Sequence, residues 1–126
     1  MAIDTEGRVW SWGSNSSQLG TGNTSTIYTP ICITDTTLAE EYNNGIRFVD
    51  VEVGLGISIL IDNEGKVWTC GNYIGNGNSN TVNVPVCITD LENDLHEEYE
   101  KGVKIEKTAI MNGYSIDDNR GFIDSL

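Results

Sequence analysis

The chain contains two copies of one sequence pattern, and this internal repeat constrains its fold more than any other feature. Residues 3–13, IDTEGRVWSWG, align with residues 61–71, IDNEGKVWTCG, at an offset of 58. After a deletion of three residues, residues 30–35, PICITD, align with residues 85–90, PVCITD, at an offset of 55. Units of about this length usually bury their apolar faces against neighbouring units. We therefore expect a repeat architecture with a period of about 57 residues.

Each copy carries the signals of short β-strands joined by turns. In the first copy, the Asp-x-x-Gly segment at residues 4–7 is typical of a hairpin turn between two β-rich runs. Valine and tryptophan then favour a strand over residues 8–13. Pro30 is expected to open another strand, because proline is tolerated at a strand's first position. Runs over residues 48–53 and 58–61 complete four strands per period, which is the content of one propeller blade.

Polar loops and short helices are expected between the strands. Residues 14–29 and 72–84 are rich in glycine, asparagine, serine and threonine, and this composition predicts long loops. Residues 38–44 and 95–101 share a Glu-Glu-Tyr centre, which favours one or two turns of helix. Each of these segments is followed by a glycine that fits a left-handed C-cap.

Taken together, these motifs resemble a known repeat family. The pattern Asp-x-x-Gly-x-Val-Trp-x-Trp-Gly-x-Asn, followed by QLGTGN at residues 18–23 and by Pro30, resembles the repeat of the regulator of chromosome condensation family. The resemblance covers nearly the whole chain and is strongest over residues 3–35 and 48–90. It implies an all-β fold, a partial β-propeller of four-stranded antiparallel blades with short helical connectors.

The resemblance also implies how the chain is organised. We expect a single unit of tandem propeller repeats over residues 1–126, with repeat one at approximately 1–57, repeat two at 58–114 and a degenerate or truncated third at 115–126. Family members resemble a seven-bladed propeller, whereas this chain contains one complete four-strand set. Because blades bury their faces against neighbouring blades, we expect either an excerpt of a longer protein or self-association of several copies to complete a propeller.

The charge balance narrows the classes of partner. The chain has 19 acidic and 7 basic residues and a formal net charge of −12. Such a surface repels phosphate and gives no counterion release on DNA, so no nucleic acid is expected as a direct partner. No apolar run approaches the roughly 20 residues that cross a bilayer, and charged residues follow Met1 closely. Neither a membrane span nor a signal peptide is expected, which favours a cytoplasmic location.

Residues that usually carry catalysis or hold cofactors are scarce. The single histidine, His96, lies in a connector where the first copy has Ala39, and we expect its side chain to be exposed. The Gly-x-Gly segments lack the third glycine and the following helix of a dinucleotide site. The acidic turns lack the ligand spacing of a calcium loop. We therefore expect no enzyme, no cofactor, and no catalytic, cofactor-binding or metal-binding residues.

Cysteine and tryptophan are expected to fill the core. The cysteines are odd in number and form no C-x-x-C pair, which disfavours a closed disulfide framework and a zinc site. The tryptophans stand at strand positions, where such residues pack in the core more often than they form a sugar-binding platform. The residues concerned are Cys32, Cys70, Cys87, Trp10, Trp12 and Trp68.

The resemblance and the polar loops favour a non-enzymatic protein-interaction scaffold, or a fragment of such a propeller, that binds a protein partner of unknown identity. Two alternatives remain open. One is guanine-nucleotide exchange on a small GTPase as part of a longer propeller, which the founding member of the family performs. The other is carbohydrate binding by an extracellular propeller. The candidate protein-binding residues lie in the two polar loops and are Asn15, Ser17, Gln18, Asn23, Tyr28, Asn72, Tyr73, Asn76 and Asn80.

Overall fold

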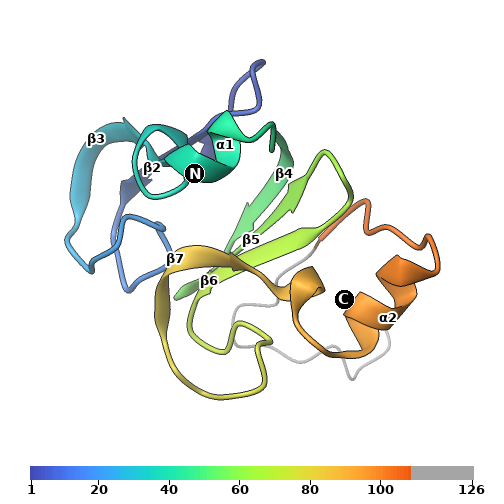
Figure 1. Cartoon of the computed structure of the whole chain (residues 1–126). Helices are drawn as coiled ribbons and strands as arrows, with labels where there is room; N and C mark the ends of the chain where they lie inside the picture. The colour runs from blue at the N-terminus through green and yellow to red at the C-terminus, as the bar shows by residue number, and fades with distance from the viewer. Residues whose placement is uncertain (109–126) are drawn as a thin grey trace, which may run out of the picture.

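The computed structural model describes residues 1–108 of the chain, and these residues form two antiparallel β-sheets (Figure 1). Sheet A contains three strands in the order β1-β2-β3, and sheet B contains four in the order β4-β5-β6-β7. Within each sheet every strand pairs with its neighbour along the chain, as in a propeller blade. The expected fold, a partial propeller of antiparallel blades, is confirmed. The strands are β1 (Ala2–Ile3), β2 (Val9–Gly13), β3 (Ile27–Cys32), β4 (Phe48–Val53), β5 (Ile57–Asp62), β6 (Val67–Gly71) and β7 (Val82–Cys87).

Each sheet is followed by a helical connector. A 3-10 helix comes directly after the last strand, and a short α-helix follows a few residues later (Figure 1). The glycines after the two α-helices have φ angles of +103° and +96°, so the expected left-handed C-caps are present. The connectors are η1 (Ile33–Asp35) with α1 (Ala39–Asn43), and η2 (Ile88–Asp90) with α2 (Asp94–Glu100).

The prolines lie inside strands and not at their starts, which corrects the prediction. β3 begins at Ile27, ahead of Pro30, and β7 begins at Val82, ahead of Pro85. Among the described residues, β3 and β7 each pair with one strand only, so the missing proline N–H interrupts no ladder on the open side. The Ile-Thr-Asp segments expected to end these strands form the 3-10 helices instead. Their threonine hydroxyls accept the backbone N–H groups at the start of β2 and β6.

The hydrophobic core joins the two copies of the repeat. Its members from the first copy come from sheet A and the connector that follows it, and they pack against side chains of sheet B. The rings of Phe48 and Trp68 meet edge to face, with centroids 5.7 Å apart and planes at 79°. Neither sheet therefore has a core of its own, as expected for units that are stabilised by their neighbours. The buried cluster consists of Val9, Ile33, Leu38, Phe48, Leu60 and Trp68.

Two further searches of the structure bear on location and cofactors. Within residues 1–108, no helix is both long and apolar enough to cross a membrane. In the same part of the chain, no three histidine, cysteine or acidic side chains are grouped closely enough to hold a metal ion.

Candidate protein-interaction surface

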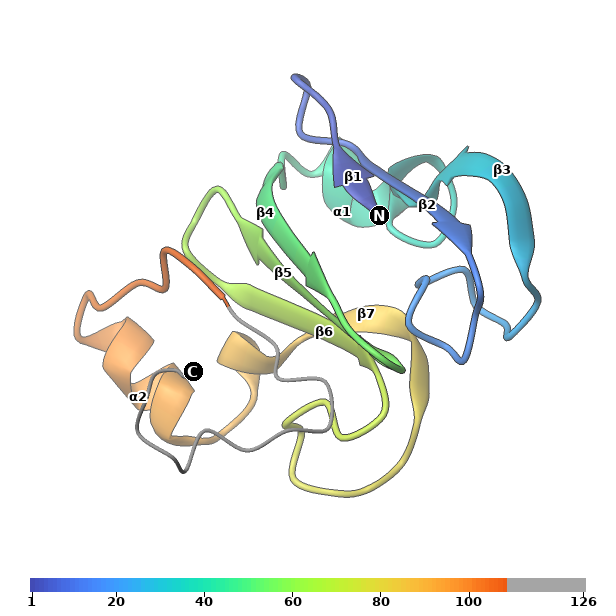
Figure 2. The same ribbon diagram turned by 180° about the vertical axis from the view of Figure 1, so that it is seen from behind.

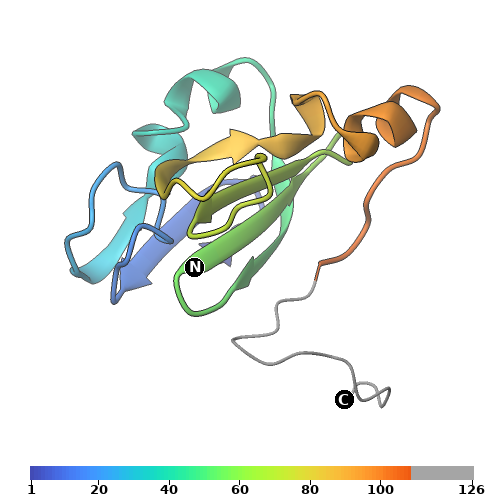
Figure 3. The ribbon, with the colours of Figure 1, turned by 90° about the horizontal axis from the view of Figure 1, so that it is seen from below.

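The turns and loops of the two sheets gather at two ends of the strands (Figures 2 and 3). One end, called the hairpin end below, carries the tight turns at residues 4–8 and 63–66 together with the helical connectors. The other, called the loop end, carries the loops at residues 14–26, 54–56 and 72–81. The two ends differ in chemistry, and this difference decides which of them is the better candidate for binding.

At the hairpin end, the carboxylate of Asp4 is fully engaged in holding its own turn. Oδ1 accepts the backbone N–H groups of Glu6 at 2.9 Å and Arg8 at 3.0 Å. Oδ2 accepts the indole Nε1–H of Trp10 at 3.0 Å and the Arg8 Nε–H at 2.8 Å. These donors, the Trp10 indole above all, hold the pKa of Asp4 well below its ordinary value. The motif that opens each repeat therefore locks a hairpin.

The second copy repeats this arrangement in a more buried setting. Asp62 is 1% exposed, and its Oδ1 accepts the N–H groups of Glu64 at 2.8 Å and Lys66 at 3.0 Å. Its Oδ2 accepts the Nε1–H of Trp68 at 2.9 Å. Both aspartates thus bind protein donors, and their lone pairs serve the turn and not a cation.

A tyrosine from each connector fastens the helix to the hairpin. The Tyr42 hydroxyl donates to the carbonyl of Glu6 at 2.8 Å, and the Tyr99 hydroxyl donates to the equivalent carbonyl of Glu64 at 2.9 Å. The Arg47 guanidinium lies 3.7 Å from the centroid of the Tyr42 ring, a close cation–π contact. The clasp appears in both copies, which indicates a structural role.

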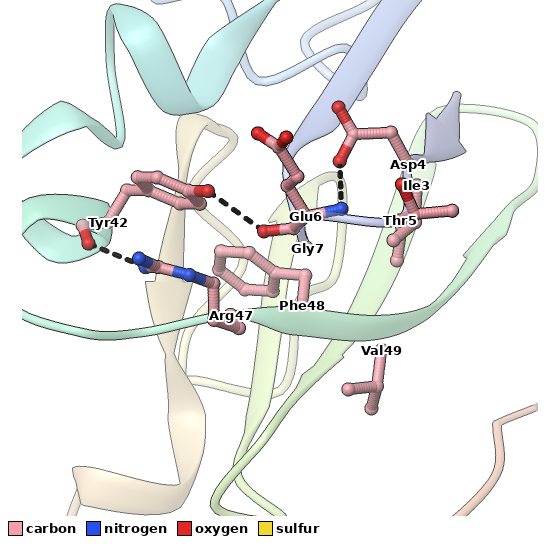
Figure 4. A pocket seen from close by; sticks show the side chains of 9 residues that line it. All are labelled: Ile3, Asp4, Thr5, Glu6, Gly7, Tyr42, Arg47, Phe48 and Val49. Atoms are coloured by element: carbon pink, nitrogen blue, oxygen red, sulfur yellow. Dashed lines mark hydrogen bonds between the residues drawn. The ribbon is translucent and has the colours of Figure 1, made fainter.

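A shallow cavity of about 750 Å³ opens beside the first clasp (Figure 4). Its walls include Asp4, Tyr42 and Arg47, but the polar groups of these residues already have protein partners. Arg47 Nη1–H donates to the carbonyls of Tyr42 at 2.8 Å and Ile46 at 2.9 Å. The cavity therefore offers a ligand mainly groups that already stabilise the fold.

At the loop end, Asn15 organises the first long loop. Its Nδ2–H groups donate to the Thr21 hydroxyl at 3.2 Å and to the Asn23 and Ser25 carbonyls, both at 3.0 Å. Its Oδ1 accepts the Ser17 N–H at 2.9 Å. One buried side of the loop is thereby fixed, and its tip remains exposed. Loops fixed on a rigid scaffold in this way often carry binding residues.

The second long loop is fixed by a similar use of asparagine. The Thr81 hydroxyl donates to Asn72 Oδ1 at 2.7 Å, which closes the base of the loop. At its tip, the Asn80 N–H donates to Asn78 Oδ1 at 2.9 Å, an Asx-type turn. The loop end is therefore an ordered surface, built from side-chain to backbone hydrogen bonds.

The structure divides the nine predicted binding residues by exposure. Tyr28 and Tyr73 are the most exposed, at 90% and 78%. The exposed group is Asn23, Tyr28, Tyr73 and Asn80, and the half-buried group is Asn15, Asn72 and Asn76. Ser17 and Gln18 are buried, because this part of the loop packs on sheet B. The exposed and half-buried residues remain proposals for binding, and the two buried residues present no side chain to a partner.

Two exposed apolar residues near this end were not identified from the sequence. Leu55, in the β4–β5 turn, is 81% exposed, and Trp12, on β2, is 41% exposed. Trp68 is buried as expected, whereas the prediction that Trp12 fills the core is wrong. The repeat alignment held a signal for Trp12, because the second copy has Cys70 at this position.

The remaining candidates for chemistry are placed as follows. Cys32 and Cys70 are buried and Cys87 is half-buried, all as free thiols. Burial raises the pKa of the Cys70 thiol to about 12 and that of Cys87 to about 11, so both are protonated at neutral pH. His96 is half-buried and not exposed as expected, because its Nδ1 lies 3.0 Å from the Thr89 carbonyl.

Comparisons with known proteins agree with this description. Residues 6–61 match the model of the regulator of chromosome condensation (RCC1) repeat. Among solved structures, the chain is similar to human WBSCR16, with a TM-score of 0.57 and 26% sequence identity over 69% of this chain. The matched part spans 23% of the length of that protein. The resemblance found in the sequence is thereby confirmed.

Proposed function

The chain carries a regulator of chromosome condensation repeat over residues 6–61, and on this premise we propose that it is a non-enzymatic protein-interaction scaffold whose loop end binds a protein partner. The observation that supports this proposal most strongly is the composition of the loop end. Its three loops contain no charged residue, although the chain has a net charge of −12. They consist largely of asparagine, glycine, serine and threonine, with exposed tyrosines beside them.

This composition is typical of surfaces that recognise proteins. Binding loops of antibodies use tyrosine as a rigid contact and serine, glycine and asparagine as adaptable hydrogen-bonding groups. Here Tyr28 and Tyr73 supply exposed rings, and Leu55 adds an exposed apolar side chain between the long loops. Because no formal charge contributes, we expect the affinity for the partner to depend little on ionic strength.

The chemistry at the two ends supports a binding role over a catalytic one. The best-placed carboxylates, Asp4 and Asp62, are occupied by hydrogen bonds that hold their turns. The thiols of Cys70 and Cys87 have raised pKa values, which makes them poor nucleophiles. A scaffold acts through surface complementarity and requires neither group.

The proposal is tested by comparing which proteins bind to three forms of the chain in quantitative affinity purification. Asn80→Arg places a bulky charge on the exposed tip of the second loop, and Val103→Arg places the same charge at a half-exposed position near the hairpin end. We expect a partner that is retained by the wild type and Val103→Arg but reduced at least about tenfold by Asn80→Arg, since a buried charge in an interface costs more than about 1.4 kcal/mol. Equal retention by all three forms would contradict the assignment of the loop end.

Two further measurements separate the alternative functions. Acceleration of guanine-nucleotide release from purified small GTPases would indicate exchange activity in place of simple scaffolding. A change in tryptophan fluorescence on titration with oligosaccharides would indicate sugar binding, with exposed Trp12 as the reporter. We expect neither signal from this chain alone.

A further inference from the structure

The first long loop is bound to sheet B through contacts that define how one repeat packs on the next. The Gly22 N–H donates to the carbonyl of Asn83, on β7, at 2.9 Å. Gly20 lies so close to Pro85 that an added Cβ would come within 3.0 Å of the proline ring. These two contacts place the glycine-rich part of the loop along the edge strand of the following sheet.

A third contact lies deeper in the same interface. The carbonyl of Gln18 accepts a hydrogen bond from the Ser58 hydroxyl, and the Cys70 thiol lies 3.4 Å from the same oxygen. Cys70 and Ser58 are both fully buried there. The loop of the first copy thus covers the face of sheet B that carries Cys70.

The internal repeat supplies a second, unoccupied set of the same groups. At the offset of 55, Gly22 and Gly20 correspond to Gly77 and Gly75, while Asn83 and Pro85 correspond to Tyr28 and Pro30. All four of these counterparts are exposed. Tyr28 is 90% exposed, and an added Cβ at Gly77 would meet nothing within 4 Å.

The deeper contact has an exposed counterpart as well. Tyr73 directly precedes Ile74 as Gln18 precedes Leu19, and Trp12 stands where the second copy has Cys70. Gln18 and Cys70 are buried against each other, whereas Tyr73 and Trp12 are 78% and 41% exposed. The two exposed aromatic side chains therefore lie at the two sides of an interface that the chain forms once internally.

We propose that a second copy of this chain docks head to tail, with the loop at residues 72–81 of one copy on the outer face of sheet A of the other. In this arrangement the Gly77 N–H donates to the Tyr28 carbonyl, and Gly75 packs on Pro30. Tyr73 covers Trp12 as Gln18 covers Cys70. The outer face of sheet A, defined by Trp10, Trp12, Tyr28 and Pro30, is the counterpart of the face of sheet B that is buried inside one chain.

The charge distribution permits this contact between two acidic molecules. Neither the loop at residues 72–81 nor the four residues that define the outer face carry a charge, so two chains of net charge −12 can meet there. The contact is heterologous, because different surfaces of the two copies meet. It therefore leaves one free face and one free loop on every dimer, and assembly continues to a closed ring or an open filament.

The test uses light scattering on the full chain and on two variants that each block one side. Trp12→Lys places a charge on the outer face, and Tyr73→Lys places one on the loop. Each variant alone is expected to have the monomer mass of 13.8 kDa, whereas the wild type is expected to rise above it with concentration. An equimolar mixture retains one intact face and one intact loop, so it is expected to form a species of twice the monomer mass and nothing larger.

Circular dichroism shows whether each variant is folded, and Pro30→Glu, at an exposed strand position, provides a second way to block the face. Val103→Lys, near the hairpin end, is the matched control and should assemble like the wild type. A wild type that is monomeric at every concentration would overturn the proposal and leave the face for a repeat of a different chain. Assembly that survives both substitutions, or a mixture that stays monomeric while both variants are folded, would overturn it equally.

Discussion

Two glycines at the same position of the repeat allow the effect of packing to be separated from that of backbone conformation. Gly13 and Gly71 end β2 and β6 with φ angles of +108° and +106°, so alanine is strained at both positions. At Gly13 an added Cβ would meet nothing within 4 Å. At Gly71 it would overlap the carbonyl oxygen of Gly56 and lie 2.9 Å from the Gly56 carbon and the Ile57 Cα. The difference arises because sheet B has a β4–β5 turn beside this glycine.

The magnitudes follow from these contacts. The unfavourable φ angle costs about 1–3 kcal/mol at either position. At Gly71 the neighbouring backbone must also move, and overpacking of this kind adds about 1–3 kcal/mol. We therefore expect Gly71→Ala to lower the free energy of unfolding by about 2–6 kcal/mol and Gly13→Ala by about 1–3 kcal/mol.

Urea unfolding followed by tryptophan fluorescence measures both losses at one protein concentration. With a denaturant dependence of about 1–3 kcal/mol per molar urea, the midpoint of Gly71→Ala should lie below that of Gly13→Ala by roughly 1 M. Unchanged slopes would show that both variants unfold from a native-like state. Equal midpoints for the two variants would refute the reasoning, because they would show that the contact with the Gly56 carbonyl has no energetic consequence.

Three further predictions concern the core, the first hairpin and the thiols. Phe48→Ala should lower the free energy of unfolding by about 3–5 kcal/mol in the same urea assay, because the ring is 1% exposed and packs edge to face on Trp68. The hydrogen bonds that lower the pKa of Asp4 stabilise the fold above the ordinary carboxyl pKa of about 4, and this contribution should be lost as the pH falls towards the lower folded value. Asp4→Asn should therefore show a smaller loss of stability between pH 5 and 3 than the wild type, and an identical pH profile would contradict this. An alkylating reagent at neutral pH should modify half-buried Cys87 before Cys70, whose pKa of about 12 reduces the thiolate fraction by roughly three orders of magnitude relative to a free thiol. Peptide mass spectrometry should find Cys70 modified at full rate only in urea.

Most of the strands could be predicted from the sequence, because local chemistry determines them. The Asp-x-x-Gly turn and the valine and tryptophan that follow define a hairpin without reference to the rest of the chain. The Ile-Thr-Asp segments were placed in strands because their composition is β-favouring. Their conformation depends instead on threonine hydroxyls that accept N–H groups from a strand about 22 to 25 residues earlier, and composition does not reveal such a bond.

The binding loops show the same division between local and non-local causes. The exposure of Asn23 and Asn80 follows from polar composition in a loop tip, and the sequence was sufficient to place them there. The burial of Gln18 has a different cause, since its carbonyl is covered by Ser58, 40 residues later in the chain. A polar residue in a polar loop gives no local sign that the next repeat will cover it.

The exchange of Trp12 for Cys70 at one position of the repeat is explained by what covers each residue. Cys70 is 0% exposed beneath the Gln18 carbonyl, and a tryptophan there would have to displace the loop that joins the two copies. Nothing from the described part of the chain covers Trp12 in this way, and its ring is 41% exposed. A large aromatic side chain that is half exposed beside Tyr28 and Pro30 is unfavourable in an isolated molecule and favourable in an interface. The position at which the repeat departs from its own pattern is therefore the position at which the packing inside one chain differs from the packing available between chains.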